Sequence, residues 1–211
     1  MTETQLNKKK IKIIHISYFI GSLSLGGTEK QFLKIINSLD KKKFKIDLYI
    51  LDKSGDLFEQ LDKKIKVYLP KFTFKSKLKH LLNFIVNYYR VRKTKPDIIH
   101  CFLPFAYLMG GFIGLLTKNQ NIIMSRRSLN NYQKKFKFFP VRKIENFLHK
   151  RIRLIIANAS AVKKNLIDEG ASDKKIIIIR NGFIKPKATQ NETHTILKKK
   201  LGIKKNCFVF L

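Results

Sequence analysis

The fold is decided by one stretch, IKIIHISYFIGSLSLGGTE, which covers residues 11–29. Residues 11–17 are largely apolar and β-branched and contain no turn residue, so we expect a buried strand. Gly21, Gly26 and Gly27 follow with small polar residues around them, and the apolar residues after them take helical spacing. A strand, a glycine-rich loop and a helix direct backbone N–H groups and the positive end of a helix dipole at one point. The stretch therefore predicts an α/β unit with a place for a phosphate or another anion.

The glycine-rich loop matches neither of two familiar phosphate-binding patterns. Residues 21–28 fit the frame of a Walker A loop, but Gly27 stands where that loop needs its lysine. The dinucleotide pattern G-x-G-x-x-G is also absent. Hydrolysis of a nucleoside triphosphate is therefore not expected, and a glycine-rich turn that binds nothing is the alternative.

The chain is strongly basic. It has 211 residues, 44% of them hydrophobic, and a formal net charge of +31. The length suffices for one core and the beginning of a second domain, and the charge must attract nucleic acid, anionic lipid or phosphorylated ligands. Cys101 and Cys207 form no C-x-x-C pair, which fits a reducing cytosol and argues against a metal site. The polar start and the lack of a spanning apolar run predict neither a signal peptide nor a membrane span.

Strands and helices are expected to alternate along the chain. The expected strands are residues 11–17, 44–51, 65–69, 97–100, 121–125, 154–157 and 175–179. The expected helices begin after residue 28 and then cover residues 72–95, 105–116, 141–149 and 160–169. This alternation predicts an α/β fold with a Rossmann-like, doubly wound, mostly parallel sheet.

Three expectations concern how the helices pack. Ser160 is expected to N-cap its helix, and Gly110, Gly111 and Gly114 to let their helix approach the sheet closely. The helix at 72–95 carries an apolar stripe at helical spacing, which we expect to face the core, with a membrane contact as the alternative. The stripe consists of Leu78, Leu81, Leu82, Ile85, Tyr88 and Tyr89.

Several polar residues fall at the carboxyl ends of expected strands, where ligands bind in doubly wound sheets. They are His100, Ser125, Arg126, Arg127 and Asn158, and the glycine-rich loop lies at the same edge. This shared edge predicts one ligand site. Other interpretations stay open: His100 as a hydrogen-bonded core residue, the two arginines as a solvated rim, and Asn158 as a turn residue.

Four runs, in this order and spacing, resemble the amino-terminal half of enzymes of glycosyltransferase family 4, which have the GT-B fold. They are Leu25–Glu29 (LGGTE), Pro96–His100 (PDIIH), Ala157–Ser160 (ANAS) and residues 170–182. The resemblance covers roughly residues 10–211. In that family a nucleotide-sugar donor lies in a cleft between two Rossmann-like domains, and the amino-terminal domain mainly holds the acceptor.

The resemblance implies roles for several residues. Gly26 and Gly27 would lie against the donor diphosphate, and His100 would contact the transferred sugar. Ser125-Arg126-Arg127 stands where many relatives have a histidine. The candidate acceptor or cleft residues are Ser125, Arg126, Arg127, Asn158, Asn181 and Gly182. No metal or other cofactor is expected, because the nucleotide sugar is a substrate.

The resemblance also implies a domain plan. Residues 1–184 would form the acceptor-side domain, residues 185–193 a linker, and residues 194–211 the incomplete start of a donor-binding domain. Alone, the chain is expected to bind nucleotide sugars weakly and to transfer no sugar. The expected partners are a nucleotide-sugar donor, a glycan or lipid-linked acceptor of cell-surface polysaccharide synthesis, and the missing carboxyl-terminal domain.

The basic charge also predicts peripheral binding to an anionic membrane from the cytoplasmic side. The candidate contacts are Lys75, Lys79, Arg126, Lys134, Lys135 and Phe138.

Two other classes of protein stay open. Residues 126–142 interleave aromatic and basic side chains, as nucleic-acid-binding surfaces do, although no helix-turn-helix, zinc or RNP motif is present. The second class is a non-catalytic half-protein that pairs with a separate partner domain.

Overall fold

The computed structural model describes residues 12–129, 141–182, 196, 198–204 and 207. The chain divides into two compact units, residues 1–181 and residues 182–211, which are described separately. In the second unit, residues 198–200 are helical. The expected linker at 185–193 lies outside the described residues.

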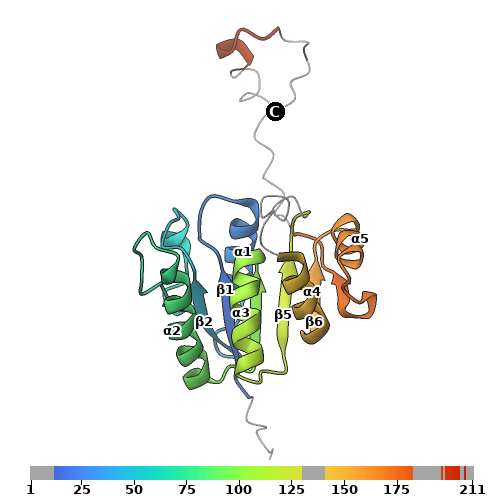
Figure 1. Cartoon of the computed structure of the whole chain (residues 1–211). Coiled ribbons are helices and arrows are strands. Elements are labelled where there is room, and N and C mark those ends of the chain that lie inside the picture. The colour runs from blue at the N-terminus through green and yellow to red at the C-terminus, as the bar shows by residue number, and fades with distance from the viewer. Residues whose placement is uncertain (1–11, 130–140, 183–195, 197, 205–206, 208–211) are drawn as a thin grey trace, which may run out of the picture. The chain divides into compact units, whose positions relative to one another are not determined.

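The first unit is built on a seven-stranded, wholly parallel sheet with the strand order β3-β2-β1-β4-β5-β6-β7 (Figure 1). The strands are β1 (Ile14–Ile20), β2 (Phe44–Ile50), β3 (Lys66–Tyr68), β4 (Ile98–Phe102), β5 (Ile122–Arg126), β6 (Leu154–Ala157) and β7 (Ile176–Ile178). The predicted Rossmann-like, doubly wound fold is confirmed. The first strand runs three residues closer to the glycine-rich loop than residues 11–17 would place it.

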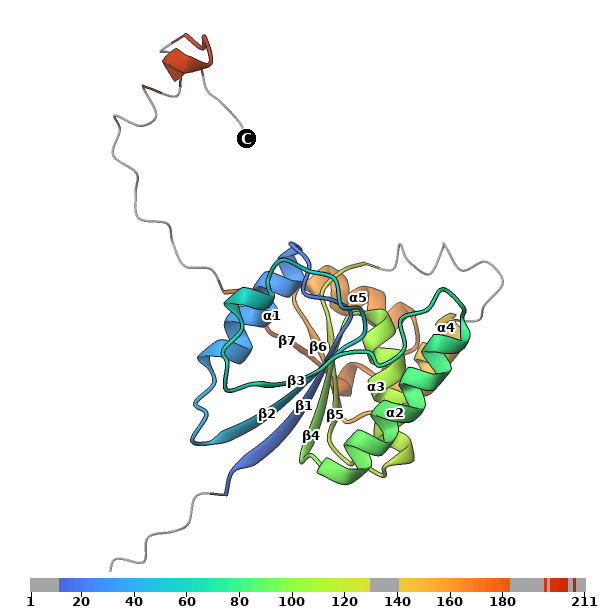
Figure 2. The same ribbon diagram turned by 90° about the vertical axis from the view of Figure 1, so that its left-hand side faces the viewer.

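Helices cover both faces of this sheet. The α-helices are α1 (Gly27–Ser38), α2 (Leu78–Thr94), α3 (Pro104–Leu116), α4 (Val141–Arg151) and α5 (Ser160–Asp168), and short 3₁₀ turns lie at Phe58–Gln60 and Asp173–Lys175. The chain steps from β1 toward β3 and then in the opposite direction from β4 to β7. Because such crossovers are right-handed, the reversal places α1 on one face and α2 to α5 on the other, as Figure 2 shows.

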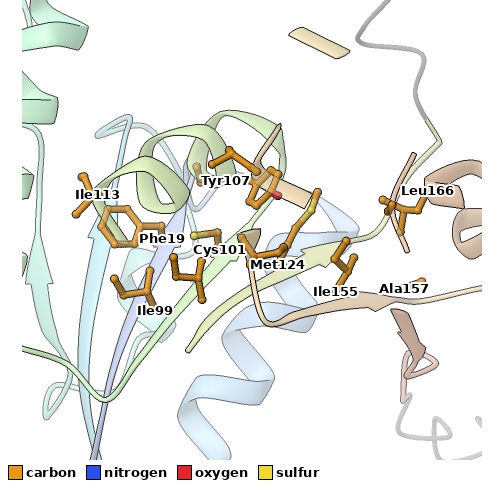
Figure 3. Close-up of a cluster of buried hydrophobic side chains, with 14 of the residues drawn as sticks. Phe19, Ile99, Cys101, Tyr107, Ile113, Met124, Ile155, Ala157 and Leu166 are labelled. Atoms are coloured by element: carbon orange, nitrogen blue, oxygen red, sulfur yellow. The ribbon is translucent and has the colours of Figure 1, made fainter. Parts of the chain in front are cut away.

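A buried apolar cluster lies on each face. The larger one joins the sheet to α3, α4 and α5, and Figure 3 shows part of it. Gly110 and Gly114 bring α3 close to the strands: a Cβ on Gly110 would lie 2.5 Å from the Sγ of Cys101, and one on Gly114 would lie 2.6 Å from the Ile122 side chain. The predicted close packing of these two glycines is confirmed. Gly111 faces α4 instead.

Helix α2 contradicts the prediction that its apolar stripe faces the core. It begins at Leu78 rather than at residue 72, and its buried residues are Asn83, Asn87 and Val91. Most of the stripe points to solvent, with exposed fractions of 53% for Leu78, 56% for Leu81, 41% for Ile85 and 61% for Tyr89.

Asn83, in the middle of α2, faces inward and pairs with backbone groups of the segment before the helix. The Oδ1 of Asn83 accepts hydrogen bonds from the backbone N–H groups of Lys71 and Phe72, each at 3.0 Å, and its Nδ2 donates to the Phe72 carbonyl at 2.8 Å. These hydrogen bonds favour an inward asparagine at this position over an inward leucine. The three hydrogen bonds of Asn83 therefore favour the rotation of α2 about its axis that turns this asparagine inward and the apolar stripe outward.

Two smaller features complete the fold. The N-cap of α5 is Ala159, which makes no side-chain capping bond, so the prediction that Ser160 caps this helix is wrong by one residue. Among the residues that the structure describes, no helix is both long enough and apolar enough to cross a membrane.

Candidate functional site

The sheet order reverses between β1 and β4, and the site begins there. Neighbouring strands whose connections leave in opposite directions open a crevice at their carboxyl ends. The glycine-rich loop, residues 21–26, leaves β1 on one side of this crevice, and Leu103 leaves β4 on the other.

The glycine-rich loop is held in place by the loop that follows β2. Leu23 is fully buried; its N–H donates to the Ser54 carbonyl at 3.3 Å, and its carbonyl accepts from the Leu57 N–H at 3.1 Å. Gly55 has a φ of +140°, and a Cβ there would lie 2.2 Å from the Leu23 carbonyl carbon. We call this contact between the two loops, at Leu23 and Gly55, the clamp. Sequence reasoning missed it, and Gly55 in a turn is its one local signal.

Gly26 and Gly27 form the start of α1. Gly26 is the N-cap, with extended backbone angles, and Gly27 is the first helical residue. A Cβ on Gly27 would meet no atom within 4 Å, so the space beside it is open. A Cβ on Gly26 would lie 2.1 Å from the Glu29 Oε2, which shows that the Glu29 carboxylate folds back over the helix N-terminus. A carboxylate is favourable there because the N-terminal N–H groups and the dipole attract negative charge.

His100 lies on the strand next to the glycine-rich loop. It is paired in register with Tyr18 of β1, and its Nε2 lies 2.8 Å from the Ser125 Oγ. The imidazole contacts the rings of Tyr18 and Phe102, with centroids 5.3 Å and 4.5 Å away. Burial, together with the smaller effect of the Arg127 charge, lowers the pKa of His100 to about 3. His100 is therefore neutral near pH 7, and the serine restricts its orientation.

Arg126 points away from this group. It ends β5 with its side chain only 1% exposed, its Nη2 donates to the Glu169 Oε1 at 3.0 Å, and its Nη1 lies 3.6 Å from the Glu145 Oε1. Arg126 thus joins β5 to α4 and to the end of α5 inside the larger cluster. The prediction that Arg126 contacts an acceptor or a membrane is wrong, because the side chain is enclosed and bound to two carboxylates.

Arg127 lies on the opposite face, with His100. Its guanidinium carbon is 5.4 Å from the centroid of the Phe102 ring, and it donates a hydrogen bond to the Oδ1 of Asn181. Partial burial lowers the pKa of Arg127. The Nδ2 of Asn158 donates to the Arg127 carbonyl at 3.3 Å. Arg127, Asn158 and Asn181 therefore connect the ends of β5, β6 and β7, while Gly182 belongs to the second unit.

A pocket of about 960 Å³ opens on the other side of the glycine-rich loop. Gly21 and Ser22 form part of its wall, and the remainder comes from α2, α3 and the segments after β2 and β3. Apolar side chains such as Phe84 and Phe105 lie beside the basic or polar groups of Lys53, Lys79, His80 and Asn87. Sequence reasoning missed this pocket, although the asparagines in the middle of α2 were a signal that this helix has a polar inner side.

Solved structures share this fold over about half of their own length. HepE from Anabaena in complex with UDP and glucose has a TM-score of 0.68 and 17% identity, over 90% of this chain and 50% of that chain. The apo lipopolysaccharide outer core galactosyltransferase WaaB has a TM-score of 0.62 and 16% identity, over 83% and 48%. A glycosyltransferase from Rickettsia africae has a TM-score of 0.57 and 16% identity, over 92% and 51%. The chain therefore spans about half the length of these proteins, and identities this low show the fold alone.

Comparison of the sequence with whole families is more specific. No curated protein matches the sequence significantly. The model of Glycosyltransferase Family 4, in contrast, matches residues 25–184, from the end of the glycine-rich loop to just beyond Asn181. The match covers most of the chain and confirms the resemblance seen in its motifs. Together with the fold of the amino-terminal half of a GT-B enzyme, it shows that this chain belongs to glycosyltransferase family 4.

Proposed function

We propose that this chain is the acceptor-side half of an enzyme that moves a sugar from a nucleotide-sugar donor to a glycan or lipid-linked acceptor. The observation that carries the proposal is the family match over residues 25–184, which includes Gly26, Gly27 and His100. Structures of HepE with UDP and with UDP-glucose support a nucleoside diphosphate sugar as the donor class. Synthesis of cell-surface polysaccharide is the process that such an acceptor fits.

The start of α1 is proposed to bind the donor diphosphate. Transfer leaves negative charge on the departing diphosphate, and backbone N–H groups together with a helix dipole stabilise it without a lysine. The open space beside Gly27 supports this role, because a phosphate oxygen can approach the backbone there. The Glu29 side chain has to move aside when the diphosphate binds.

His100 is proposed to orient the transferred sugar by hydrogen bonding. Its depressed pKa keeps it neutral, so it supplies a directed donor or acceptor instead of a positive charge. Because Ser125 engages Nε2, the other ring nitrogen, Nδ1, is the atom we assign to a sugar hydroxyl. Arg127 lies close enough to add positive charge on the same face.

The pocket beside Gly21 is proposed to hold the acceptor. Its apolar wall and its basic rim suit a molecule that is partly apolar and partly polar or anionic. The proposal also includes peripheral attachment of the chain to an anionic membrane. Of the candidate contacts, Lys75 is exposed and Lys79 is half-buried. Lys134, Lys135 and Phe138 lie outside the described residues, as does most of the basic and aromatic segment that favoured a nucleic-acid-binding protein.

Titration of UDP-sugars into the chain, followed by NMR, tests the donor site. Wild type should show weak, saturable binding. Gly27→Val should abolish it, because the branched side chain fills the open space beside the helix start while meeting no protein atom at its Cβ. Ser38→Val, at the exposed far end of the same helix, is the matched control and should bind as wild type does. Unchanged binding by Gly27→Val would rule out this role for the loop.

A further inference from the structure

Helix α2 exposes a line of large apolar side chains, although it packs on the core through Val91, Phe84 and Tyr88. Leu78, Leu81, Ile85 and Tyr89, here called the outer stripe, lie three or four residues apart, so they form one line about 16 Å long. All four side chains are exposed, and Figure 1 shows α2 on an outer flank of the first unit. A continuous exposed line of large apolar side chains marks an interaction surface.

The charges around the outer stripe identify the kind of partner. Residues 71–95 contain eight Lys and Arg residues and no Asp or Glu. Lys75 and Lys77, before the first turn, and Arg92 and Lys93, in the last turn, are exposed. Apolar side chains flanked at both ends by exposed cations are complementary to a surface that is anionic outside and apolar beneath. A second copy of this chain does not fit, because two molecules of net charge +31 repel each other.

We propose that the outer stripe docks on an anionic lipid bilayer, with α2 lying along the membrane surface. Leu81 and Ile85 enter the boundary between headgroups and acyl chains, and Tyr89 places its ring there with its hydroxyl toward water. The four exposed cations lie against lipid phosphates. This inference rests on the proposed function. It assigns the proposed membrane contact to one face of one helix.

Docking through the outer stripe places the pocket next to the membrane. The opposite side of α2, which includes His80, Asn83 and Asn87, lines that pocket. The pocket therefore lies about one helix diameter, roughly 10 Å, from the lipid headgroups. An acceptor whose polar part projects from a lipid anchor reaches it from this side, which favours the lipid-linked class over a free glycan.

A single fluorescent reporter tests the docking geometry directly. The chain has no tryptophan, so Tyr89→Trp in the full 211-residue chain reports on one position only. Its emission should shift to shorter wavelength on addition of phosphatidylglycerol vesicles and should not shift with phosphatidylcholine vesicles. Leu116→Trp is the matched control: Leu116 is 58% exposed at the end of α3, outside the outer stripe, and should show no shift.

Sedimentation with the same vesicles tests the energetic contribution of the stripe. The double variant Leu81→Gln/Ile85→Gln should weaken binding to phosphatidylglycerol roughly tenfold or more, since two side chains lose their burial in lipid. Leu116→Gln should bind as wild type does. Binding should fall as salt rises, because the screening length shortens from about 10 Å at 0.1 M to about 3 Å at 1 M.

The vesicle assays need no nucleotide sugar, so their outcome is independent of the donor-site titration. Equal binding by wild type and the double glutamine variant, or equal spectral shifts at positions 89 and 116, would overturn the proposal. A concentration-dependent dimer that the double variant abolishes would also overturn it, in favour of a second copy of the chain. Far-ultraviolet circular dichroism of each variant shows whether the fold is retained.

Discussion

At the scale of single residues, the end of β5 shows how much one position along a strand matters. Successive side chains of a strand point to opposite faces of the sheet. Arg126 therefore enters the larger buried cluster, where Glu145 and Glu169 bind it, whereas Arg127 lies over the ring of Phe102. The two neighbouring cations have the same chemistry and different functions: one fixes the packing of helices, and the other contributes charge to the proposed site.

Arg126→Met should destabilise the protein strongly. Removal of the guanidinium takes a cation away from the buried carboxylates of Glu145 and Glu169, and breaking a buried pair in this way typically costs about 3–5 kcal/mol. Arg127→Met, the matched control, should cost about 1 kcal/mol or less, since its guanidinium is only partly buried. Urea denaturation at pH 7 measures both values. Equal losses for the two variants would contradict the assignment of Arg126 to a structural role.

The stability of the protein should fall between about pH 6.5 and pH 3 because of His100. Its pKa is lowered from 6.5 to about 3 in the folded protein, so in this range the unfolded chain binds a proton that the folded chain does not. The contribution of His100 to the free energy of unfolding is fully present above its pKa in the unfolded chain, and it decreases as the pH falls toward its pKa in the folded protein. His100→Gln should show a smaller decrease in urea denaturation series at pH 7, 5.5 and 4. The same decrease in both proteins would mean that the pKa of His100 is not lowered in the folded protein.

The sequence predicts the edge at which these residues lie, but not their faces. His100, Ser125 and Arg127 each follow an apolar run, so they are recognisable as residues at strand ends. The face depends on where the strand begins, and element boundaries are the least certain part of sequence analysis. A shift of one residue exchanges the faces of Arg126 and Arg127, so their position at the end of a strand does not separate them. The bond between His100 and Ser125 depends on the register of β4 and β5, which no local pattern encodes.

At the scale of elements, the loop after β2 is as important to the proposed site as the glycine-rich loop itself. The two loops exchange backbone hydrogen bonds at Leu23, and Gly55 allows them to touch. The orientation of α2 is likewise decided by the backbone groups of the segment before it. The two loops are distant in sequence, so no local pattern shows that they touch. The inward side of α2 carries asparagines, so the apolar periodicity predicts the wrong rotation.

Gly55→Ala should damage the donor site from a distance. The added Cβ collides with the Leu23 backbone, and the φ of +140° is unfavourable for alanine, so we expect a loss of about 1–3 kcal/mol in stability. UDP-sugar binding should weaken as well, because the glycine-rich loop has to move. Gly21→Ala is the matched control for stability, since its Cβ meets no atom within 4 Å. Thermal unfolding that is unchanged in Gly55→Ala would show that the clamp is not needed.

At the scale of the whole molecule, the first unit offers one part of the proposed chemistry. The described part of the chain offers a helix N-terminus, a neutral histidine and a pocket, and it corresponds to about half of each similar structure. In transfer from a nucleotide sugar, domain closure brings donor and acceptor together and excludes water. The alternation of strands and helices was sufficient to predict this architecture, because a doubly wound sheet is a global pattern that tolerates small errors at its boundaries.

The 211-residue chain alone should transfer no sugar. It should gain turnover only when joined to, or mixed with, a donor-binding half from the same family. The measurement is release of UDP from a panel of UDP-sugars, with and without that second half, in the presence of a lipid-linked acceptor. Steady turnover by the purified chain on its own would refute the two-domain proposal.

The strand order also governs how the protein assembles during synthesis. Strands β1, β2 and β3 can pair as soon as the ribosome releases them, but the other edge of β1 has to wait for β4. The contact between His15 and Asp97, which borders this pairing, joins residues 82 positions apart. Closure of so long a segment is slow compared with local pairing. A nascent chain that stops before β4 therefore has the glycine-rich loop but no crevice, and it exposes an unpaired edge of its central strand to aggregation and chaperones.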